Sequence, residues 1–163
     1  TSSDMIGIEL GGSIKNVIAL AAGISVGLGC GDNTMAALIT RGITEIARLG
    51  IAMGGRLETF AGLSGIGDLI VTCTSKHSRN HNAGVLIGKG YTMDEAMNEV
   101  KQVVEGVYSA KAAKKLAEKY QVSMPIVSEI NEVLFGDLSA KDALANLLTR
   151  DRCEEYPNDP WQQ

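Results

Sequence analysis

The sequence contains one long stretch that is almost free of charge. Among the residues from Gly11 to Gly31, only Lys15 carries a charged side chain. From Gly12 to about Leu28 the stretch would form a helix that is apolar on nearly every side. Such a helix has to be surrounded by other elements, so we expect it at the centre of the fold. The preceding residues, Met5 to Leu10, are expected to form a strand or an extended entry that ends in a tight turn at Gly11-Gly12.

The composition favours packed helices around this segment. The chain has 163 residues, enough for one domain with a substantial core, and 45% of them are hydrophobic. Because only 4% are aromatic and there are three prolines, the core has to be built from Ala, Leu, Ile, Val and Met. This composition favours helices over a β-sandwich. We predict an all-α, single multi-helix domain over residues 1–150 and a partly disordered tail over residues 151–163.

Helix signals recur along the rest of the chain. Thr92 and Glu95 form the pattern of a capping box, Pro125 suits the first turn of a helix, and Ser139 suits a helix cap. The predicted helices cover about residues 32–53, 57–63, 83–89, 93–100, 105–120, 125–135 and 140–149. On the first of these, charged side chains share one face and are expected to form a ladder of ion pairs, made by Arg41, Glu45 and Arg48.

Charge and cysteine usage argue against several classes of function. A net charge of -4 gives no electrostatic reason to expect nucleic acid. Cys30, Cys73 and Cys153 are widely spaced, so we expect buried reduced thiols rather than a metal site. We see no signal peptide, and the run Val17–Cys30 is too short and too rich in Gly and Ser to cross a bilayer. We expect a cytoplasmic protein without membrane insertion.

Lys15 is the first candidate for chemistry. Its neighbours at helical spacing are glycines and aliphatic residues, none of which can carry a counter-charge. Desolvation among such groups disfavours the ammonium form, so the amine can give and take a proton near neutral pH. The alternative is that Lys15 extends from the start of a core helix to water. This helix alone leaves both interpretations open.

Asp68 is the second candidate. It is the only charged residue between Glu58 and Lys76, and it follows a Gly-x-Gly turn that can bring the backbone close to a ligand. A carboxylate held at a pocket wall can accept a hydrogen bond from a lysine or a hydroxyl. The alternative is that Asp68 only caps a helix over residues 69–74.

The polar segment Ser75–Asn82 is the third candidate. It holds two hydroxyls, two amide side chains, an arginine and a lysine, which together can bind an anion such as phosphate. Polar loops are more often only solvated. His77 and His81 lie four residues apart without an evident third ligand, so zinc is not expected. No P-loop is present, and no G-x-G-x-x-G motif opens a strand–helix unit.

Four ordered segments resemble a known family. They are Gly7–Asn16, Ala36–Gly42, Ala61–Leu69, and Thr72–Ser75 followed by Ser78-Arg79-Asn80. With this spacing the chain resembles NAD(P)-dependent sn-glycerol-3-phosphate dehydrogenase of the bacterial type, over roughly residues 4–150. The family joins an N-terminal Rossmann domain to an all-α substrate domain of the 6-phosphogluconate dehydrogenase C-terminal type. This chain looks like the second half only.

The resemblance implies a reaction and the residues for it. The family interconverts dihydroxyacetone phosphate and sn-glycerol 3-phosphate with NAD(P)H, which supplies the backbone of glycerophospholipids. Lys15 matches the catalytic lysine, which binds substrate and exchanges a proton with its C2 oxygen. Further substrate contacts are implied for Asp68, Thr72, Ser78, Arg79 and Asn80. Cofactor contacts are implied for Arg79, Val103 and Glu105.

One departure limits this expectation. The dinucleotide-binding fingerprint of the family, and a further lysine that precedes this segment, are absent from the chain. We therefore expect NAD(P)H to be bound mainly by a Rossmann domain that is not part of this chain, and the chain alone to be inactive. Two alternatives stay open: a helical interaction or dimerisation module without chemistry, or the helical domain of a dehydrogenase for another substrate. The sequence leaves open whether the domain forms a homodimer.

Overall fold

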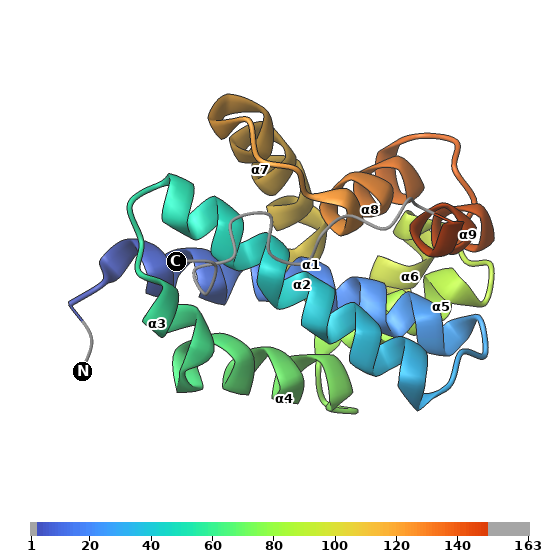
Figure 1. Cartoon of the computed structure of the whole chain (residues 1–163). Helices are drawn as coiled ribbons and strands as arrows, with labels where there is room; N and C mark the ends of the chain where they lie inside the picture. Colours follow the sequence, from blue (N-terminus) through green and yellow to red (C-terminus); the bar gives the residue numbers. More distant parts are fainter. Residues whose placement is uncertain (1–2, 150–163) are drawn as a thin grey trace.

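The nearly uncharged segment forms the central helix, as predicted. The structure is a computed structural model that describes residues 3–149. In it, α1 (Met5–Gly27) contacts α2 (Asp32–Ala52), α4 (Asp68–Thr74), α5 (Arg79–Gly88) and α7 (Glu105–Tyr120). Figure 1 shows α1 running through the middle of the molecule, with α2 beside it, α4 below and α7 above. A helix that is apolar on all sides is stable here because neighbours cover every side.

The remaining elements complete an all-α fold, which confirms the predicted fold class within the described residues. They are α3 (Leu57–Ala61), the π-helical turn η1 (Leu63–Gly67), α6 (Met93–Val100), α8 (Pro125–Phe135) and α9 (Ala140–Thr149). The capping box of Thr92 and Glu95 is present, and the Ser139 hydroxyl accepts a hydrogen bond from the Asp142 amide at 3.1 Å. The predicted tail, residues 151–163, and Cys153 lie outside the described residues.

The prediction of an extended entry over residues 5–10 was wrong, as was the turn at Gly11-Gly12. The helix starts at Met5 because the Asp4 carboxylate caps it, accepting a hydrogen bond from the Gly7 amide at 2.9 Å. The same carboxylate accepts hydrogen bonds from the Arg56 amide and the Thr59 hydroxyl. These bonds lower the pKa of Asp4, the Thr59 hydroxyl contributing most. Asp4 thereby also fixes the start of α3 against α1.

Glycines at the crossing of α1 and α5 allow these two helices to approach closely. Gly23 and Gly27 of α1 face Gly84 and Gly88 of α5, and a Cβ atom added at any of them would collide with the backbone of the other helix. Without side chains between them, the two backbones pack in direct contact. This crossing places the first turn of α5 beside the middle of α1.

Glu45, the central member of the predicted ion-pair ladder on α2, also caps another helix. Glu45 is buried, with 4% of its surface exposed, and its carboxylate accepts hydrogen bonds from the Ile126 and Val127 amides at 2.8 and 3.3 Å. Those amides belong to the first turn of α8, where Met124 supplies no side-chain cap. Glu45 therefore caps a helix that begins eighty residues further along the chain.

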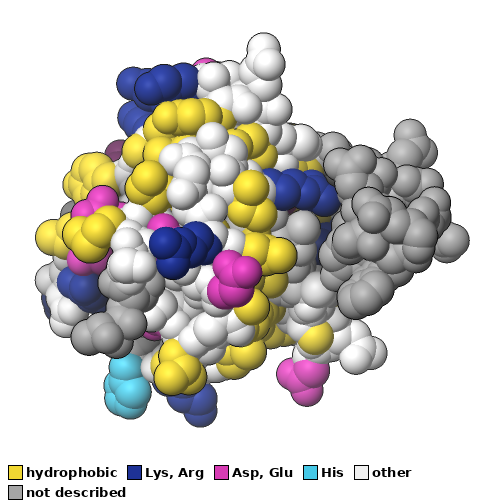
Figure 2. All heavy atoms as spheres, turned by 60° about the vertical axis from the view of Figure 1, so that its left-hand side comes forward, with side chains coloured by type: hydrophobic (Ala, Val, Ile, Leu, Met, Phe, Trp, Pro, Cys, Tyr) yellow, Lys and Arg dark blue, Asp and Glu magenta, His cyan; other side chains and the backbone are white. Residues whose placement is uncertain are grey.

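The surface carries scattered apolar side chains. Met5, Ile6, Leu57 and Leu63 are exposed, Leu63 to 90%. Figure 2 shows one face of the molecule, on which apolar side chains lie interspersed with charged ones. By length and composition α1 could cross a membrane, but 72% of its most apolar window is buried inside the fold. Burial of this kind is ordinary for the core helix of a helical domain.

Candidate functional site

Lys15 and Asp68 form an ion pair between α1 and α4. The Lys15 Nζ donates a hydrogen bond to Asp68 Oδ2, and the two side chains are 22% and 40% exposed. The helical neighbours of Lys15 on α1 carry no counter-charge, as the sequence analysis states, but α4 supplies one. Lys15 therefore does not extend alone into water; its amine is held at the edge of the core by a partly exposed carboxylate.

Asp68 does not cap α4. The helix starts after Gly67 without a side-chain cap, and the Asp68 carboxylate turns toward Lys15 instead. One turn later, the Thr72 hydroxyl donates to the Asp68 carbonyl at 2.7 Å and approaches its Oδ1 at 3.4 Å. The Gly-x-Gly turn expected before Asp68 is the π-helical η1, and π-helical turns occur often beside functional sites. Lys15, Asp68 and Thr72 thus form one cluster.

The polar loop ends earlier than predicted, because Ser78 caps α5. Its hydroxyl accepts a hydrogen bond from the His81 amide at 3.3 Å, and α5 begins at Arg79 rather than at Ala83. Arg79 and Asn80 therefore lie in the first turn of a helix. The N-terminus of a helix favours negatively charged groups, which strengthens the expectation of an anion site here.

A buried hydrogen-bond network, made mainly by amide groups, joins Asn80 to α1 and α7. Its Nδ2 donates to the Asn16 side-chain oxygen at 3.0 Å, and its Oδ1 accepts from the Gly106 amide at 2.8 Å. Asn16 Nδ2 in turn donates to Glu105 at 3.2 Å. Buried amides stabilise a fold only when they are paired in this way. This network fixes the starts of α5 and α7 against Asn16, the residue that follows Lys15.

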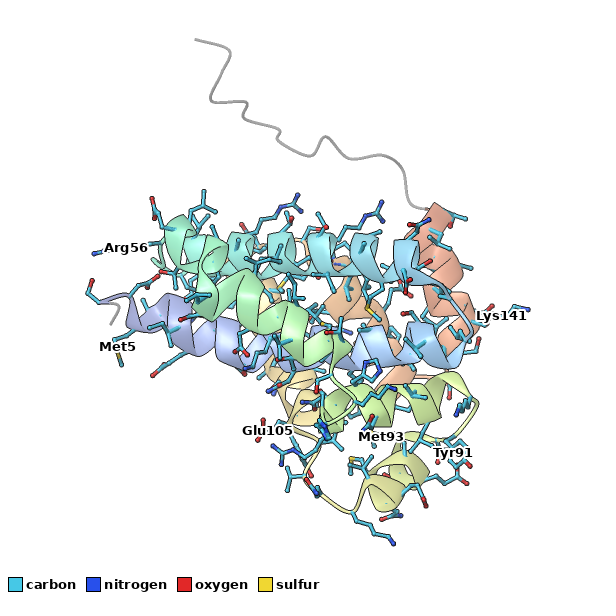
Figure 3. The ribbon with its side chains drawn as sticks, turned by 90° about the horizontal axis from the view of Figure 1, so that it is seen from below. Met5, Arg56, Tyr91, Met93, Glu105 and Lys141 are labelled. Carbon is cyan, nitrogen blue, oxygen red and sulfur yellow. The ribbon has the colours of Figure 1, made fainter. Side chains whose placement is uncertain are left out.

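Arg79 and Glu105 form a second ion pair on the exposed side of this network. Arg79 Nη2 lies 3.3 Å from Glu105 Oε1, and both side chains are well exposed. Val103, two residues before Glu105, is 61% exposed, whereas Val104 is buried. Figure 3 shows Glu105 at the start of α7, on the side of α1 where α5 also lies. The three predicted cofactor contacts thus lie together at the exposed edge formed by the starts of α5 and α7.

Asn16 is the residue that the sequence analysis did not single out. It is 7% exposed and bonds to both Asn80 and Glu105. A signal was present: an amide side chain in an otherwise apolar helix has to find partners, because burial without them is costly. The positions of its partners, on α5 and α7, could not be read from the sequence.

Among the described residues, no observation supports metal binding or a nucleophilic cysteine. No group of three metal-ligating side chains occurs among residues 3–149. Burial raises the pKa of the Cys73 thiol to about 12, so Cys73 is not a nucleophile at neutral pH. A surface hollow of about 560 Å³ lies between the end of α7 and the start of α8, and none of the predicted site residues lines it.

Comparison with known proteins identifies the family of this chain. Residues 4–145 match the family described as NAD-dependent glycerol-3-phosphate dehydrogenase C-terminus. The glycerol-3-phosphate dehydrogenases [NAD(P)+] of Agathobacter rectalis and Fusobacterium nucleatum are 65% and 61% identical over 99% and 93% of this chain. These stretches are 48% and 45% of the relatives, so the chain spans about half their length. The crystal structure of glycerol-3-phosphate dehydrogenase from Coxiella burnetii superposes with a TM-score of 0.89, at 45% identity, over 91% of this chain and 46% of that one.

The all-α fold and the family match over residues 4–145 define a helical C-terminal domain of the NAD-dependent dehydrogenase class. Within that class, the chain belongs to the NAD-dependent glycerol-3-phosphate dehydrogenase family, to which it corresponds in the C-terminal part. The resemblance stated from the four sequence segments is thereby confirmed.

Proposed function

We propose that this chain is the substrate-binding and proton-transferring half of a soluble, cytoplasmic NAD(P)-dependent glycerol-3-phosphate dehydrogenase. The observation that carries the proposal is the Lys15–Asp68 ion pair together with its neighbour Asn16. Asn16 bonds directly to Asn80, and through Glu105 it is linked to Arg79. A proton donor and an anion-binding helix start thus lie on one side of the domain. These are the two groups that a phosphorylated ketone needs from its enzyme.

Lys15 transfers the proton. In ketone reduction, a hydride adds to C2 of dihydroxyacetone phosphate while the Lys15 ammonium gives its proton to the C2 oxygen, which becomes the hydroxyl of sn-glycerol 3-phosphate. In the reverse direction the amine takes that proton back. Asp68 holds the amine in place through their hydrogen bond, so its orientation is set before the substrate arrives.

The start of α5 binds the phosphate. Arg79 offers a guanidinium, which matches phosphate oxygens with two parallel donors, and Ser78 and Asn80 add polar groups on either side. The helix N-terminus adds its own partial positive charge. Asn80 is held by Asn16 and Gly106, so it would reach a ligand with the second hydrogen of its Nδ2.

The residues at the exposed edge fit a nicotinamide cofactor. NAD(P)H supplies the hydride when it is bound. Exposed Val103 offers an apolar contact, the Glu105 carboxylate can accept hydrogen bonds from hydroxyl or amide groups, and Arg79 can pair with a phosphate. Three residues along one edge cannot enclose a dinucleotide, so most of its binding falls to a second domain.

A fusion enzyme tests the proposal. In it, this chain replaces the matching half of the Agathobacter rectalis dehydrogenase, to which it is 65% identical. Lys15→Ala should lower kcat for dihydroxyacetone phosphate by about 10²–10⁴-fold, as loss of a general acid does, with a smaller change in KM. Lys115→Ala, at an exposed position on α7, is the matched control. Full turnover by the Lys15→Ala enzyme would favour an interaction module without chemistry.

The chain itself offers a test that needs no turnover. Titration of the 163-residue chain with sn-glycerol 3-phosphate should shift the amide NMR signals of Ser78, Arg79 and Asn80. Glycerol should leave these signals in place, since the phosphate provides the charge that Arg79 recognises. Equal shifts with a hydroxy acid that lacks phosphate would instead favour a related dehydrogenase for another substrate.

A further inference from the structure

The hydrogen bonds around Asn16 form a closed ring. The Gly106 amide donates to Asn80 Oδ1 at 2.8 Å, and Asn80 Nδ2 donates to Asn16 Oδ1 at 3.0 Å. Asn16 Nδ2 then donates to Glu105 Oε2 at 3.2 Å. Because Glu105 and Gly106 are consecutive in the chain, the last acceptor is covalently joined to the first donor. The ring therefore passes once through each of α1, α5 and α7.

The direction of these hydrogen bonds is fixed at both ends of the ring. A backbone amide can only donate, so Gly106 has to face the side-chain oxygen of Asn80. An ionised carboxylate can only accept, so Glu105 has to face the side-chain nitrogen of Asn16. The Asn80 nitrogen and the Asn16 oxygen are then left for each other, and they form the middle bond. Each of the two amides thus has a single orientation that satisfies its bonds.

Gly106 allows the ring to close. A Cβ atom added at this position would lie 2.6 Å from the backbone oxygen of Asn16 and 3.0 Å from Asn80 Oδ1. The start of α7 can approach α1 this closely because Gly106 has no side chain. The Glu105 carboxylate, one residue earlier, is thereby held within reach of Asn16.

Asn16 has no donor left for a substrate. Its Nδ2 also donates to the Gly12 carbonyl at 3.4 Å, so both hydrogens are used, and the residue is 7% exposed. Its partners can act outside the ring. Asn80 keeps one hydrogen of its Nδ2, and the Glu105 side chain is 52% exposed. Asn16 therefore acts through its partners, with its oxygen on Asn80 and its nitrogen on Glu105.

We propose that Asn16 is a positioning residue that holds Asn80 for the substrate and Glu105 for the nicotinamide cofactor. The inference rests on the proposed function, which assigns those two roles. Because different atoms of one amide serve the two partners, a substitution can separate them. Asn16→Asp keeps an oxygen toward Asn80 but puts a second carboxylate oxygen toward Glu105, where the two charges repel each other.

The fusion enzyme measures both sides at pH 8, which keeps the carboxylates charged. Asn16→Asp should raise KM for NADPH about tenfold, the effect of one lost hydrogen bond, and change KM for dihydroxyacetone phosphate by less than about threefold. Asn16→Leu, which has no polar side-chain atoms, should raise both constants. Ser13→Ala is the matched control, because it removes another hydrogen bond between α1 and α7, the one to Ser109 at 3.2 Å. It should leave both constants unchanged.

Exchanging the donor and the acceptor gives the sharpest test. When Asn16→Asp is combined with Glu105→Gln, the amide introduced at position 105 can donate to the carboxylate introduced at position 16. In the Glu105→Gln background, Asn16→Asp should therefore raise KM for NADPH by less than about twofold, instead of about tenfold. An equal rise in both backgrounds, or unchanged constants in Asn16→Leu, would overturn the proposal.

Urea unfolding of the 163-residue chain follows the same cycle without turnover. Asn16→Asp should lower the midpoint, and adding Glu105→Gln should restore most of it; a midpoint that is not restored would refute the ring. A restored midpoint with an unchanged KM for NADPH in Asn16→Asp would mean that the ring is structural only, which would refute the positioning role. An inactive unsubstituted fusion enzyme would count against the proposed function, whereas the unfolding cycle would still confirm or refute the ring.

Discussion

At the scale of single residues, buried polar side chains decide where the helices of this domain meet. Asn16, Asp4 and Glu45 each sit in or beside an apolar helix, and each bonds to a distant part of the chain. Of the three, only Asn16 stands out in the sequence as a polar residue in an apolar setting. Their partners are not visible there, because a hydrogen bond across more than fifty residues leaves no local pattern. For the same reason, Lys15 and Asp68 could be singled out separately but not paired without the resemblance.

Asp4 should make the stability of the domain depend on pH in the acid range. Its pKa is lowered in the folded chain, so the folded state keeps the carboxylate charged at pH values where the unfolded chain binds a proton. The stabilisation is complete above the unfolded value of 3.8 and is lost as the pH falls through the lower folded value. Asp4→Asn should therefore be less stable than the parent at pH 7, and the difference should shrink below about pH 4.

Urea unfolding at pH 7, 5, 4 and 3 measures this difference. Asp137→Asn, at an exposed position between α8 and α9, controls for the loss of one negative charge. A difference between Asp4→Asn and the parent that stays constant down to pH 3 would show that the carboxylate charge is not what caps α1.

At the scale of elements, two kinds of contact organise the helices. α1 and α5 touch through glycines, and α8 receives its cap from α2. Most helix bounds could be predicted, because capping patterns and apolar periodicity are local: the helices over 93–100, 105–120, 125–135 and 140–149 have the predicted bounds. The errors fall at two helix starts whose capping side chains were not recognised: Asp4 starts α1 at Met5, and Ser78 starts α5 at Arg79.

The glycine crossing should not tolerate a methyl group. A Cβ atom at Gly84 would meet the carbonyl oxygen of Leu20, which is backbone and cannot move aside cheaply. Gly84→Ala should lower the free energy of unfolding by about 3 kcal/mol, at the upper end for overpacking. Gly12→Ala is the matched control, since that helical glycine has open space around it. It should instead stabilise the chain by about 0.5–1 kcal/mol through helix propensity. Thermal unfolding of both variants checks the opposite signs, and a neutral Gly84→Ala would mean that the helices lie further apart.

The cap of α8 should depend on the Glu45 carboxylate. Glu45→Ala removes the acceptor of the Ile126 and Val127 amides and should cost about 2 kcal/mol of unfolding free energy, the range for hydrogen bonds to a charged group. Glu45→Gln keeps one side-chain oxygen and should cost less. Hydrogen exchange of the first-turn amides of α8 should rise in the alanine variant before that of α1 does. Equal stability of the Gln and Ala variants would contradict a capping role.

At the scale of the whole molecule, the fold brings together the residues of the proposed site. The helices place Lys15, Asp68, Arg79 and Asn80 on one side of α1, and their order along the sequence allowed the family to be identified. The detailed geometry of the site could not be predicted, because it depends on how α4, α5 and α7 cross α1. The crossing of α1 with α5 is set by four glycines, whose small size is visible in the sequence but whose contacts are not.

The same fold predicts that the 163-residue chain does not oxidise NADPH by itself. Hydride transfer requires the nicotinamide to be held at a fixed position over the substrate, and the described helices offer only Arg79, Val103 and Glu105 for this. With dihydroxyacetone phosphate and NADPH, the loss of absorbance at 340 nm should equal that of a protein-free blank, while the fusion enzyme turns over under the same conditions. Binding of sn-glycerol 3-phosphate to the chain, followed by NMR, should persist, since its contacts lie within these helices. NADPH oxidation that increases with the concentration of the chain and disappears with Lys15→Ala would show that the helical half can position the cofactor alone.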